Sequence, residues 1–219
     1  MDPAAYDAWY ASARGRWIGE VETRLLLDLL TCQNGDSVLD VGCGTGYFSR
    51  RLAQAEFRVT GIDPDVGAID FAMRKNGPIR YLRADARRLP FKDRSFDCAV
   101  AVTSLCFIEP PGAAVREMWR VARRSVVLGL LNRNSLLWLK KRHAPSYGGA
   151  RWDTSRIAQS WSSGLRPPPA LTVRSAVFGP GGGKLARGLE QLLPGRLPFG
   201  GFLAIGLARA DPLIRLGGV

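Results

Sequence analysis

Hydrophobic and polar positions follow two different periods along this chain. In the first segment, about 2–34, Leu25, Leu26, Leu29 and Leu30 recur at helical spacing, and Asn34-Gly35 predicts where the segment ends. From residue 37 onward, short β-branched runs alternate with amphipathic stretches. The pattern predicts strands at 37–41, 58–63, 79–85, 95–104 and 125–131, with helices at 48–54, 66–75 and 113–123. This alternation is typical of a parallel sheet with helices on both faces.

The rhythm changes after Asn132. Residues 132–169 hold the one His and a Pro167-Pro168-Pro169 run, and we expect a lid-like insertion there with a helix near 154–163. Two more strands are predicted at 171–178 and 202–209, on either side of a Gly- and Pro-rich connection. We expect them to close the sheet as an antiparallel edge. The chain 1–219 therefore reads as a single α/β domain with N-terminal helices over 2–34.

Composition narrows the class of protein. Hydrophobic residues make up 46% of the chain, but no run of about 20 apolar residues occurs, so no membrane span is predicted. The first ten residues have no basic stretch followed by an apolar one, which argues against a secretion signal and favours a cytoplasmic protein. The net charge is +12, and 26 of the 31 basic residues are Arg. They are dispersed rather than gathered with aromatics, which favours a solvated surface over nucleic-acid binding.

The four cysteines, Cys32, Cys43, Cys98 and Cys106, form no Cys-x-x-Cys motif, and His143 is the single histidine. A metal site is therefore not expected. Cys98 and Cys106 lie in or near an apolar strand, where a thiol acts as a small hydrophobe. A reduced, cytoplasmic protein is the interpretation that fits best.

The strongest motif is VLDVGCGTG at 38–46, where a predicted strand ends and a helix begins. Gly42, Gly44 and Gly46 let the backbone turn sharply and approach a ligand closely. The helix that follows offers unpaired N–H groups. A dinucleotide-binding loop has its third glycine at the position occupied here by Tyr47, which argues against NAD or FAD.

Acidic residues follow the next two strands. Asp63 ends the strand at 58–63, where its carboxylate can accept hydrogen bonds from both hydroxyls of a ribose. Asp85 ends the strand at 79–85 and is placed to accept from an adenine amino group, with the Ala86 N–H facing a ring nitrogen. Because the carboxyl ends of parallel strands share one edge, these residues and the glycine loop predict a nucleoside site.

The motifs VLDVGCGTG, GIDPD, ADARRLPF and FDCAVAVTSLCFIEPPGAAVREMWRV resemble the class I S-adenosylmethionine methyltransferases, in particular the type 11 group related to ubiquinone and menaquinone methylases. The resemblance covers about 36–131, and YDAWYASARG at 6–15 is similar to that group's N-terminal helix. It implies a Rossmann-like fold with a mostly parallel seven-stranded sheet and an antiparallel last strand. The group's Pro-Gly-Gly turn before the fifth strand is replaced here by Ala122-Arg123-Arg124-Ser125.

The resemblance implies a role for each matching position. S-adenosylmethionine is the implied cofactor, with S-adenosylhomocysteine as product. Gly42, Gly44 and the neighbouring backbone at Cys43 would contact its methionine part, and Asp40 would support that loop. The other implied contacts are Asp63 and Pro64 at the ribose and adenine, Asp85 and Ala86 at the adenine edge, Thr103 and Ser104 beneath the sulfonium, and Tyr6 over the cofactor.

The methyl acceptor is expected to be a small molecule bound by the N-terminal helices and the lid. His143 and Tyr147 are the candidate catalytic residues, since His143 alone has a near-neutral pKa as a free side chain. The candidate acceptor contacts are Trp9, Tyr10, Asn132, Arg151 and Trp152. The aromatics at 6, 9 and 10 could equally be packing residues.

Two other functions stay open at this point. The charge of +12 motivates an RNA or protein methyltransferase, although Glu109-Pro110-Pro111 is followed by Gly112 rather than by the aromatic residue of a base-amino methylase. A non-catalytic cofactor-binding regulator is the third reading. We expect a monomer or a homodimer.

Overall fold

The computed structural model describes residues 2–75, 77–193 and 195–209. Its strands are β1 (Ser37–Val41), β2 (Arg58–Asp63), β3 (Arg80–Arg83), β4 (Phe96–Val102), β5 (Ala122–Leu131), β6 (Ala170–Ala176) and β7 (Phe202–Ala208). The helices are α1 (Pro3–Ala11), α2 (Ala13–Leu29), α3 (Tyr47–Gln54), α4 (Val66–Arg74), α5 (Pro111–Val121), α6 (Leu136–Lys141), α7 (Ser155–Ser160) and α8 (Lys184–Leu192). Two short 3₁₀ helices, η1 (Leu105–Phe107) and η2 (Pro145–Tyr147), complete the order.

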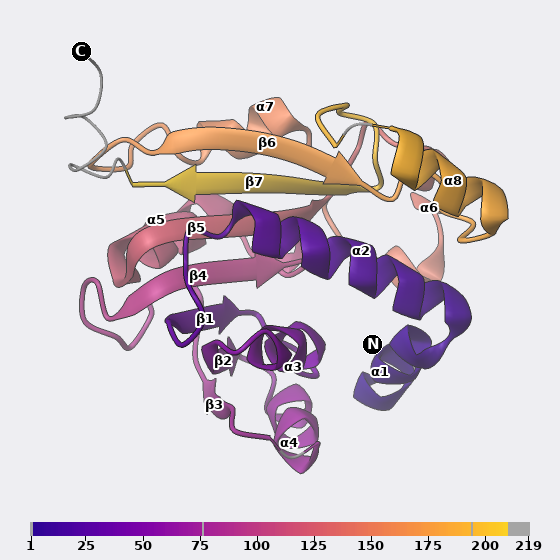
Figure 1. Cartoon of the computed structure of the whole chain (residues 1–219). Helices are drawn as coiled ribbons and strands as arrows, with labels where there is room; N and C mark the ends of the chain where they lie inside the picture. Colours follow the sequence, from indigo (N-terminus) through magenta and orange to yellow (C-terminus); the bar gives the residue numbers. More distant parts are fainter. Residues whose placement is uncertain (1, 76, 194, 210–219) are drawn as a thin grey trace.

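All seven strands form one sheet in the order β3-β2-β1-β4-β5-β7-β6 (Figure 1). Strands β1 to β5 pair in parallel, whereas β7 runs antiparallel to both of its neighbours, β5 and β6. The predicted α/β class, with an antiparallel last strand, is confirmed. The last strand differs from expectation in its position: β7 lies inside the sheet, and β6 is the edge.

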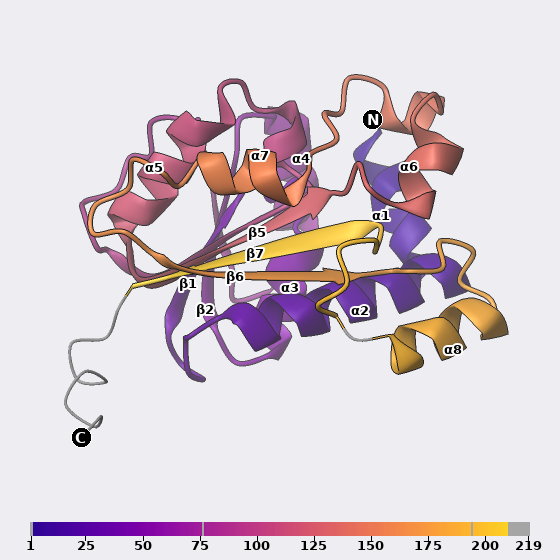
Figure 2. The same cartoon turned by 90° about the horizontal axis from the view of Figure 1, so that it is seen from above.

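Helices cover both faces of the sheet, with α5 and α7 on one face and α2 and α3 on the other (Figure 2). Each face has its own core cluster, one built around Met118 and Trp119 of α5 and the other around Leu26 of α2. Every residue of β4 is buried, as its continuous apolar pattern predicts for a central strand covered on both sides. The carboxyl edge of this covered sheet is where the predicted site residues are expected.

The N-terminal segment forms two helices, α1 and α2. Ser12 separates them and caps α2, because its Oγ accepts a hydrogen bond from Gly15 N at 3.0 Å. A Cβ atom at Gly15 would overlap the Trp9 carbonyl, so this close approach of α1 to α2 requires glycine. The sharp bend returns α1 over the carboxyl edge of the sheet.

One local expectation needs correction. The connection after β6 contains α8, which is tied back by Glu190, whose carboxylate accepts hydrogen bonds from Val177 N and Phe178 N. The lid bounds 132–169 stay a prediction; within them, Ala158 of α7 is buried in the core beside α5. As the sequence indicates, no Pro-Gly-Gly turn precedes the fifth strand, and α5 leads directly into β5 at Ala122.

The cysteines also differ from expectation. Cys32 follows α2 and Cys98 lies in β4, and the two form a disulfide across 66 residues of sequence, with their Cα atoms 6.4 Å apart. The structure therefore corrects the prediction that Cys98 is a free, reduced thiol. Only the packing of the α2–β1 connection against β4 brings these two residues together. Cys43 and Cys106 are free and buried, and burial raises the pKa of the Cys106 thiol to about 12.

Asp97 joins three strands at the amino end of the sheet. Its carboxylate accepts hydrogen bonds from Ser37 N at 2.9 Å, Ser37 Oγ at 2.6 Å and Arg123 Nη1 at 3.1 Å. Burial opposes ionisation, but these hydrogen bonds outweigh it and lower the pKa of Asp97 to about 2. A carboxylate whose pKa is depressed on folding stabilises the fold above its unfolded pKa and loses that effect as the pH falls toward 2.

We therefore expect Asp97→Asn to lower the free energy of unfolding by about 1.5–3 kcal/mol at pH 7, the usual cost of losing hydrogen bonds to a charged group. The deficit should shrink between pH 4 and pH 2. Urea unfolding followed by circular dichroism across this range measures it. The exposed Asp70 gives the control variant Asp70→Asn. Equal stability of the two variants at pH 7 would contradict the assignment.

Candidate functional site

The predicted site residues do converge at the carboxyl edge of the sheet. The parallel register pairs Val41 of β1 with Ile62 of β2, and Asp63 with Arg83 of β3. The chain after β1 then turns across β2, because Gly42 N and Cys43 N both donate to the Ile62 carbonyl at 2.8 and 2.9 Å. The ends of β1, β2 and β3 are thus held side by side by backbone hydrogen bonds.

The glycine loop has three residues in the left-handed region, with φ of +71° at Gly42, +51° at Gly44 and +75° at Gly46. A Cβ at Gly42 would overlap Ser104, whose Oγ donates to the Val41 carbonyl at 2.7 Å. A Cβ at Gly44 would meet no other side chain, because no heavy atom lies within 4 Å of the position that it would take. Gly42 is therefore needed for packing, whereas Gly44 borders open space.

The Asp63 carboxylate bridges two loops. Its Oδ2 accepts a hydrogen bond from Gly44 N and its Oδ1 from Asp65 N, both at 2.9 Å. Each oxygen keeps a lone pair for a further donor. Burial raises the pKa of Asp63 and outweighs the two backbone hydrogen bonds that lower it. The carboxylate is placed to accept from paired hydroxyls such as those of a ribose.

Asp40 lies under the same loop and is 1% exposed. Ser49 of α3 donates its Oγ hydrogen to Asp40 Oδ2 at 2.6 Å. Burial raises the pKa of Asp40 to about 6, and the nearby Asp63 adds to the shift, while the Ser49 hydrogen bond opposes it. Two acidic groups that would both gain from a nearby positive charge therefore sit below the glycine loop.

Asp85 stands at the expected strand end but has a partner already. Arg87 reaches both of its carboxylate oxygens, with Nε 3.0 Å from Oδ1 and Nη2 2.8 Å from Oδ2, and hydrogen bonding to Arg87 lowers the pKa of Asp85. Arg87 also donates to the Glu109 carbonyl at 3.0 Å, which links the loops after β3 and β4. Ala86 beside it is buried, whereas Pro64 is exposed. The adenine contact of Asp85 stays a prediction.

The loop after β4 meets α1. Thr103 has φ +48°, an uncommon conformation for a β-branched residue that often marks functional sites. The Tyr6 hydroxyl lies 3.3 Å from the Tyr10 hydroxyl. Burial raises the pKa of Tyr6, and hydrogen bonding with Tyr10 and Thr103 lowers it by less. Tyr6 thus reaches from α1 to the loop predicted to lie beneath the reacting group. Trp9 is exposed and packs edge-on against Tyr10.

Two residues of the lid face this region. The Tyr147 ring lies 5.2 Å from the Trp152 ring, and burial raises the pKa of Tyr147, with Glu22 of α2 adding to the shift. His143 is exposed and forms no hydrogen bond among the described residues. The structure therefore brings Tyr147 and Trp152, but not His143, toward α2.

The side chains of Arg151 and Asn132 donate hydrogen bonds to backbone carbonyls of neighbouring loops. Arg151 donates to the Leu105 carbonyl at 2.8 Å, the Ile108 carbonyl at 3.2 Å and the Asp153 carboxylate at 2.9 Å. Asn132 is 1% exposed, and its amide donates to the carbonyls of Pro198 and Gly200 and accepts from Asn134 N. These hydrogen bonds fix the surrounding loops, and the prediction that the two polar groups contact the acceptor stays a prediction.

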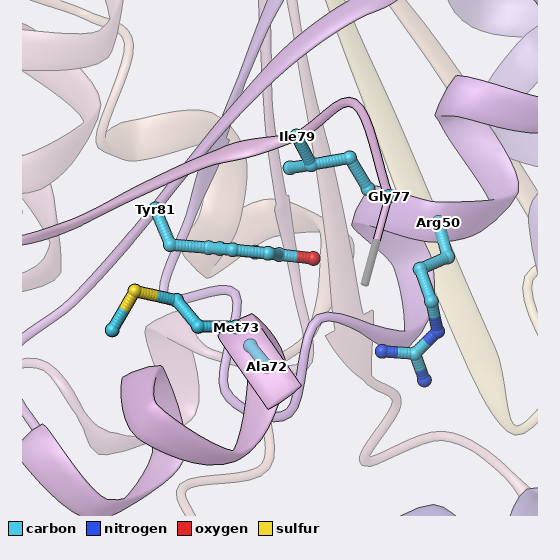
Figure 3. A pocket seen from close by; sticks show the side chains of 6 residues that line it. All are labelled: Arg50, Ala72, Met73, Gly77, Ile79 and Tyr81. Atoms are coloured by element: carbon cyan, nitrogen blue, oxygen red, sulfur yellow. The ribbon is translucent and has the colours of Figure 1, made fainter. Parts of the chain in front are cut away.

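A small pocket lies elsewhere, between α3, α4 and β3, where the Tyr81 ring and the Arg50 side chain face it (Figure 3). Its volume is about 100 Å³, below the roughly 300–1,000 Å³ that is usual for small-molecule sites. The pocket contains none of the predicted site residues and is not the donor site. Within the described residues, no three His, Cys, Asp or Glu side chains come together as metal ligands.

Sequence reasoning missed three residues of this edge. Ser49 donates a hydrogen bond to Asp40, and Arg87 donates hydrogen bonds to the Asp85 carboxylate. Glu22 is a buried carboxyl close to the tyrosines of α1 and the lid. Glu22 carried a signal, because it interrupts the apolar face of α2 between Ile18 and Leu26. The sequence contained no such signal for Ser49 or Arg87, because their hydrogen-bond partners depend on how the loops pack in the folded chain.

Comparisons with known proteins agree with this geometry. Residues 39–129 match the sequence model of a family described as a methyltransferase domain. This segment is similar to a methyltransferase domain. The match spans β1 to β5, which supply the glycine loop, Asp63, Asp85 and Thr103. S-adenosylmethionine is the methyl donor of this family, as the sequence predicts.

Relatives of the methyltransferase domain act on different acceptors. The malonyl-[acyl-carrier protein] O-methyltransferase of Serratia marcescens is 34% identical over 124 residues, which cover 57% of this chain and 46% of the relative. The demethylmenaquinone methyltransferase of Renibacterium salmoninarum is 35% identical over 100 residues, covering 46% and 42%. The chain spans about half the length of the curated relatives it matches.

A solved structure shares the fold over nearly the whole chain. It is a methyltransferase of Thermotoga maritima, titled a possible histamine N-methyltransferase, with a TM-score of 0.73, 22% identity, and coverage of 94% of this chain and 96% of that one. At this identity the likeness concerns the fold. The agreement in fold therefore extends well beyond residues 39–129.

Gly44 gives a sharp test of where the donor binds. Because open space surrounds its Cβ position, Gly44→Ala should fold with only the strain of its positive φ, but the new methyl group should block close approach of a ligand. We expect at least a tenfold weaker affinity for S-adenosylmethionine by calorimetry. Gly35 has φ +85° and equally open space far from the site, so Gly35→Ala controls for strain. Equal affinity of the two variants would contradict this placement.

Asp63 should contribute directly to donor affinity. We expect Asp63→Ala to weaken binding of S-adenosylmethionine by about 1–3 kcal/mol, through the loss of charge-assisted hydrogen bonds. The matched variant is Asp65→Ala, which removes the cap of α4, where Asp65 Oδ1 accepts from Ala68 N at 3.2 Å. It should lower stability but leave affinity unchanged. Unaltered affinity in a folded Asp63→Ala protein would refute the ribose assignment.

Proposed function

We propose that this chain transfers the methyl group of S-adenosylmethionine to a small-molecule acceptor. The observation that carries the proposal is the Asp63 carboxylate, which bridges Gly44 and Asp65 beside open space at the edge of a methyltransferase domain. When bound, S-adenosylmethionine supplies a methyl group already activated by a sulfonium. The task left to the protein is to bind, orient and exclude water.

The residues at the edge are suited to hold this donor. Gly42 and Gly44 supply close backbone, Asp63 supplies acceptors for ribose hydroxyls, and Asp40 supplies negative charge beneath the loop. Donor binding should also be favoured electrostatically, because burial raises the pKa values of Asp40 and Asp63 and a cationic ligand reverses that penalty.

The acceptor side would be closed by α1 and the lid. Tyr6 and Tyr10 come from α1, and Tyr147 and Trp152 come from the lid, so the side chains that would face an acceptor beyond the β4 loop are mostly aromatic. A space bordered in this way suits a small molecule better than a polymer. The named activities of the two curated relatives, on malonyl-[acyl-carrier protein] and on demethylmenaquinone, support the same reaction type with different acceptors.

No helix in the described ranges is long and apolar enough to cross a membrane. The net charge of +12 still favours testing RNA as an alternative acceptor. We expect no binding to a structured RNA at 150 mM salt. Tight binding with a steep salt dependence would favour the RNA reading instead.

Methyl transfer is tested with labelled S-adenosylmethionine and a small-molecule extract of cells. We expect the purified protein to bind the donor and to form S-adenosylhomocysteine together with a labelled product of low mass. The Gly44→Ala variant is the inactive control. Donor binding without label transfer to any acceptor would support the regulatory reading, and an absence of donor binding would overturn the proposal.

A further inference from the structure

Glu22 is a buried carboxyl with no hydrogen-bond or ion-pair partner among the residues that the structure describes. It lies on the inward face of α2, one helical turn from Ile18 and one from Leu26, which are both buried. The side chain is 8% exposed, and its Oε2 accepts no hydrogen bond from any residue that the structure describes. Burying an unpaired polar group is costly, so a carboxyl retained at such a position calls for a partner from outside the chain.

The surroundings of Glu22 are aromatic. The Tyr10 ring stacks on Tyr47 with centroids 3.7 Å apart, and the Tyr10 hydroxyl lies 3.3 Å from that of Tyr6. A Cβ on Gly19, one turn before Thr23 on the same helix, would overlap the Tyr47 hydroxyl, so these rings pack directly on α2. The carboxyl therefore sits where α2, α1 and α3 meet.

The lid reaches the same point. Negative charge on Glu22 raises the pKa values of Tyr6, Tyr10, Tyr47 and Tyr147, which belong to α1, α3 and the lid. Tyr6 is the residue that also meets Thr103 beyond β4. Glu22 is thus close to both walls of the acceptor space and to the loop predicted to lie beneath the reacting methyl group.

The charge balance at this point favours a cation as the missing partner. Burial is the cause that raises the pKa of Glu22 to about 8, with no Arg, Lys or His contributing to the shift. Arg14 acts on Tyr147 but not on Glu22. Arg51 lies 5.6 Å from the centroid of the Tyr47 ring, but neither Arg14 nor Arg51 forms an ion pair or hydrogen bond with Glu22 in the described part of the chain. A carboxyl with tyrosine rings around it and no cation paired to it matches an ammonium group, which gains from both the charge and the ring faces.

We propose that Glu22 binds the amino group of the methyl acceptor and removes its proton, so that the substrate class is a small amine. This proposal rests on the proposed function. Ionised Glu22 takes a proton from the ammonium and frees the nitrogen lone pair. That lone pair forms the new bond to the methyl carbon, while the carbon–sulfur bond breaks and its electron pair stays on sulfur. The proton on Glu22 is released to solvent when the methylated ammonium product leaves.

Stability of the ligand-free protein gives the first test and needs no acceptor. Because the folded pKa of Glu22 lies near 8 and the unfolded value near 4.5, the unfolded state alone ionises between those limits. Wild type should therefore lose melting temperature relative to Glu22→Gln as the pH rises from 5 to 8, and the difference should stay constant above 8. Glu20→Gln, on the exposed side of α2, should follow wild type. Parallel curves for Glu22→Gln and wild type would overturn the proposal.

Turnover gives the second test. The probes are a panel of small alkyl, aryl-alkyl and imidazole amines, each paired with the matching alcohol, carboxylate and thiol, with formation of S-adenosylhomocysteine as readout. We expect transfer to amines, with kcat/KM rising with pH through a midpoint near pH 8. Glu22→Gln should lower kcat/KM by about 10²–10⁴-fold, the usual contribution of a general base, and should lose that pH step. Glu20→Gln should keep both.

The two proposals fail in different ways. If neither wild type nor Glu22→Gln binds S-adenosylmethionine, the proposed function is wrong. If both bind it with equal affinity but the Glu22→Gln variant methylates amines as fast as wild type, the role of Glu22 is wrong. Transfer only to acceptors without an amino group also overturns it.

Discussion

The parallel register of β1 with β2 and β4 is the constraint on which the rest of this molecule depends. It brings the carboxyl ends of these strands to one edge and lets the Ile62 carbonyl receive two N–H groups of the glycine loop. With the loop held there, Asp63 can reach Gly44, and Ser104 can pack under Gly42. A slip of one residue would turn these side chains to the opposite faces of the sheet.

The acidic groups of the protein divide into two kinds by their surroundings. Asp97 and Asp85 have low pKa values because protein donors already satisfy them, and they hold strands and loops together. Asp40, Asp63 and Glu22 have raised pKa values because burial removes water without supplying a cation. The second kind gathers where the donor and the acceptor would meet. Although the chain has a net charge of +12, it therefore places three acidic groups at and beside the carboxyl edge of its sheet, where they favour binding of a cation.

The elements around the acceptor space are anchored to the loops around the donor. Asp7 of α1 forms ion pairs with Arg50 of α3 at 2.5 Å and with Lys75 beyond α4 at 2.9 Å. On the other side, Arg151 ties the lid to carbonyls of the η1 segment. These contacts join α1 to the helices that follow β1 and β2, and join the lid to the segment that follows β4.

The sequence by itself determined the strands β1 to β5, their alternation with helices, and the strand-end residues Gly44 and Asp63. Those features depend on local periodicity and on glycine or carboxylate at the point where a strand stops. It did not determine the insertion of β7 between β5 and β6, helix α8, the Cys32–Cys98 disulfide or the pairing of Arg87 with Asp85. Nor did it distinguish Arg151 and Asn132, which hold loops, from Glu22, for which the described ranges supply no hydrogen-bond partner. The reason is physical: a residue's type and spacing decide which element it joins, but which of its hydrogen bonds remain unused depends on neighbours that only the folded chain brings together.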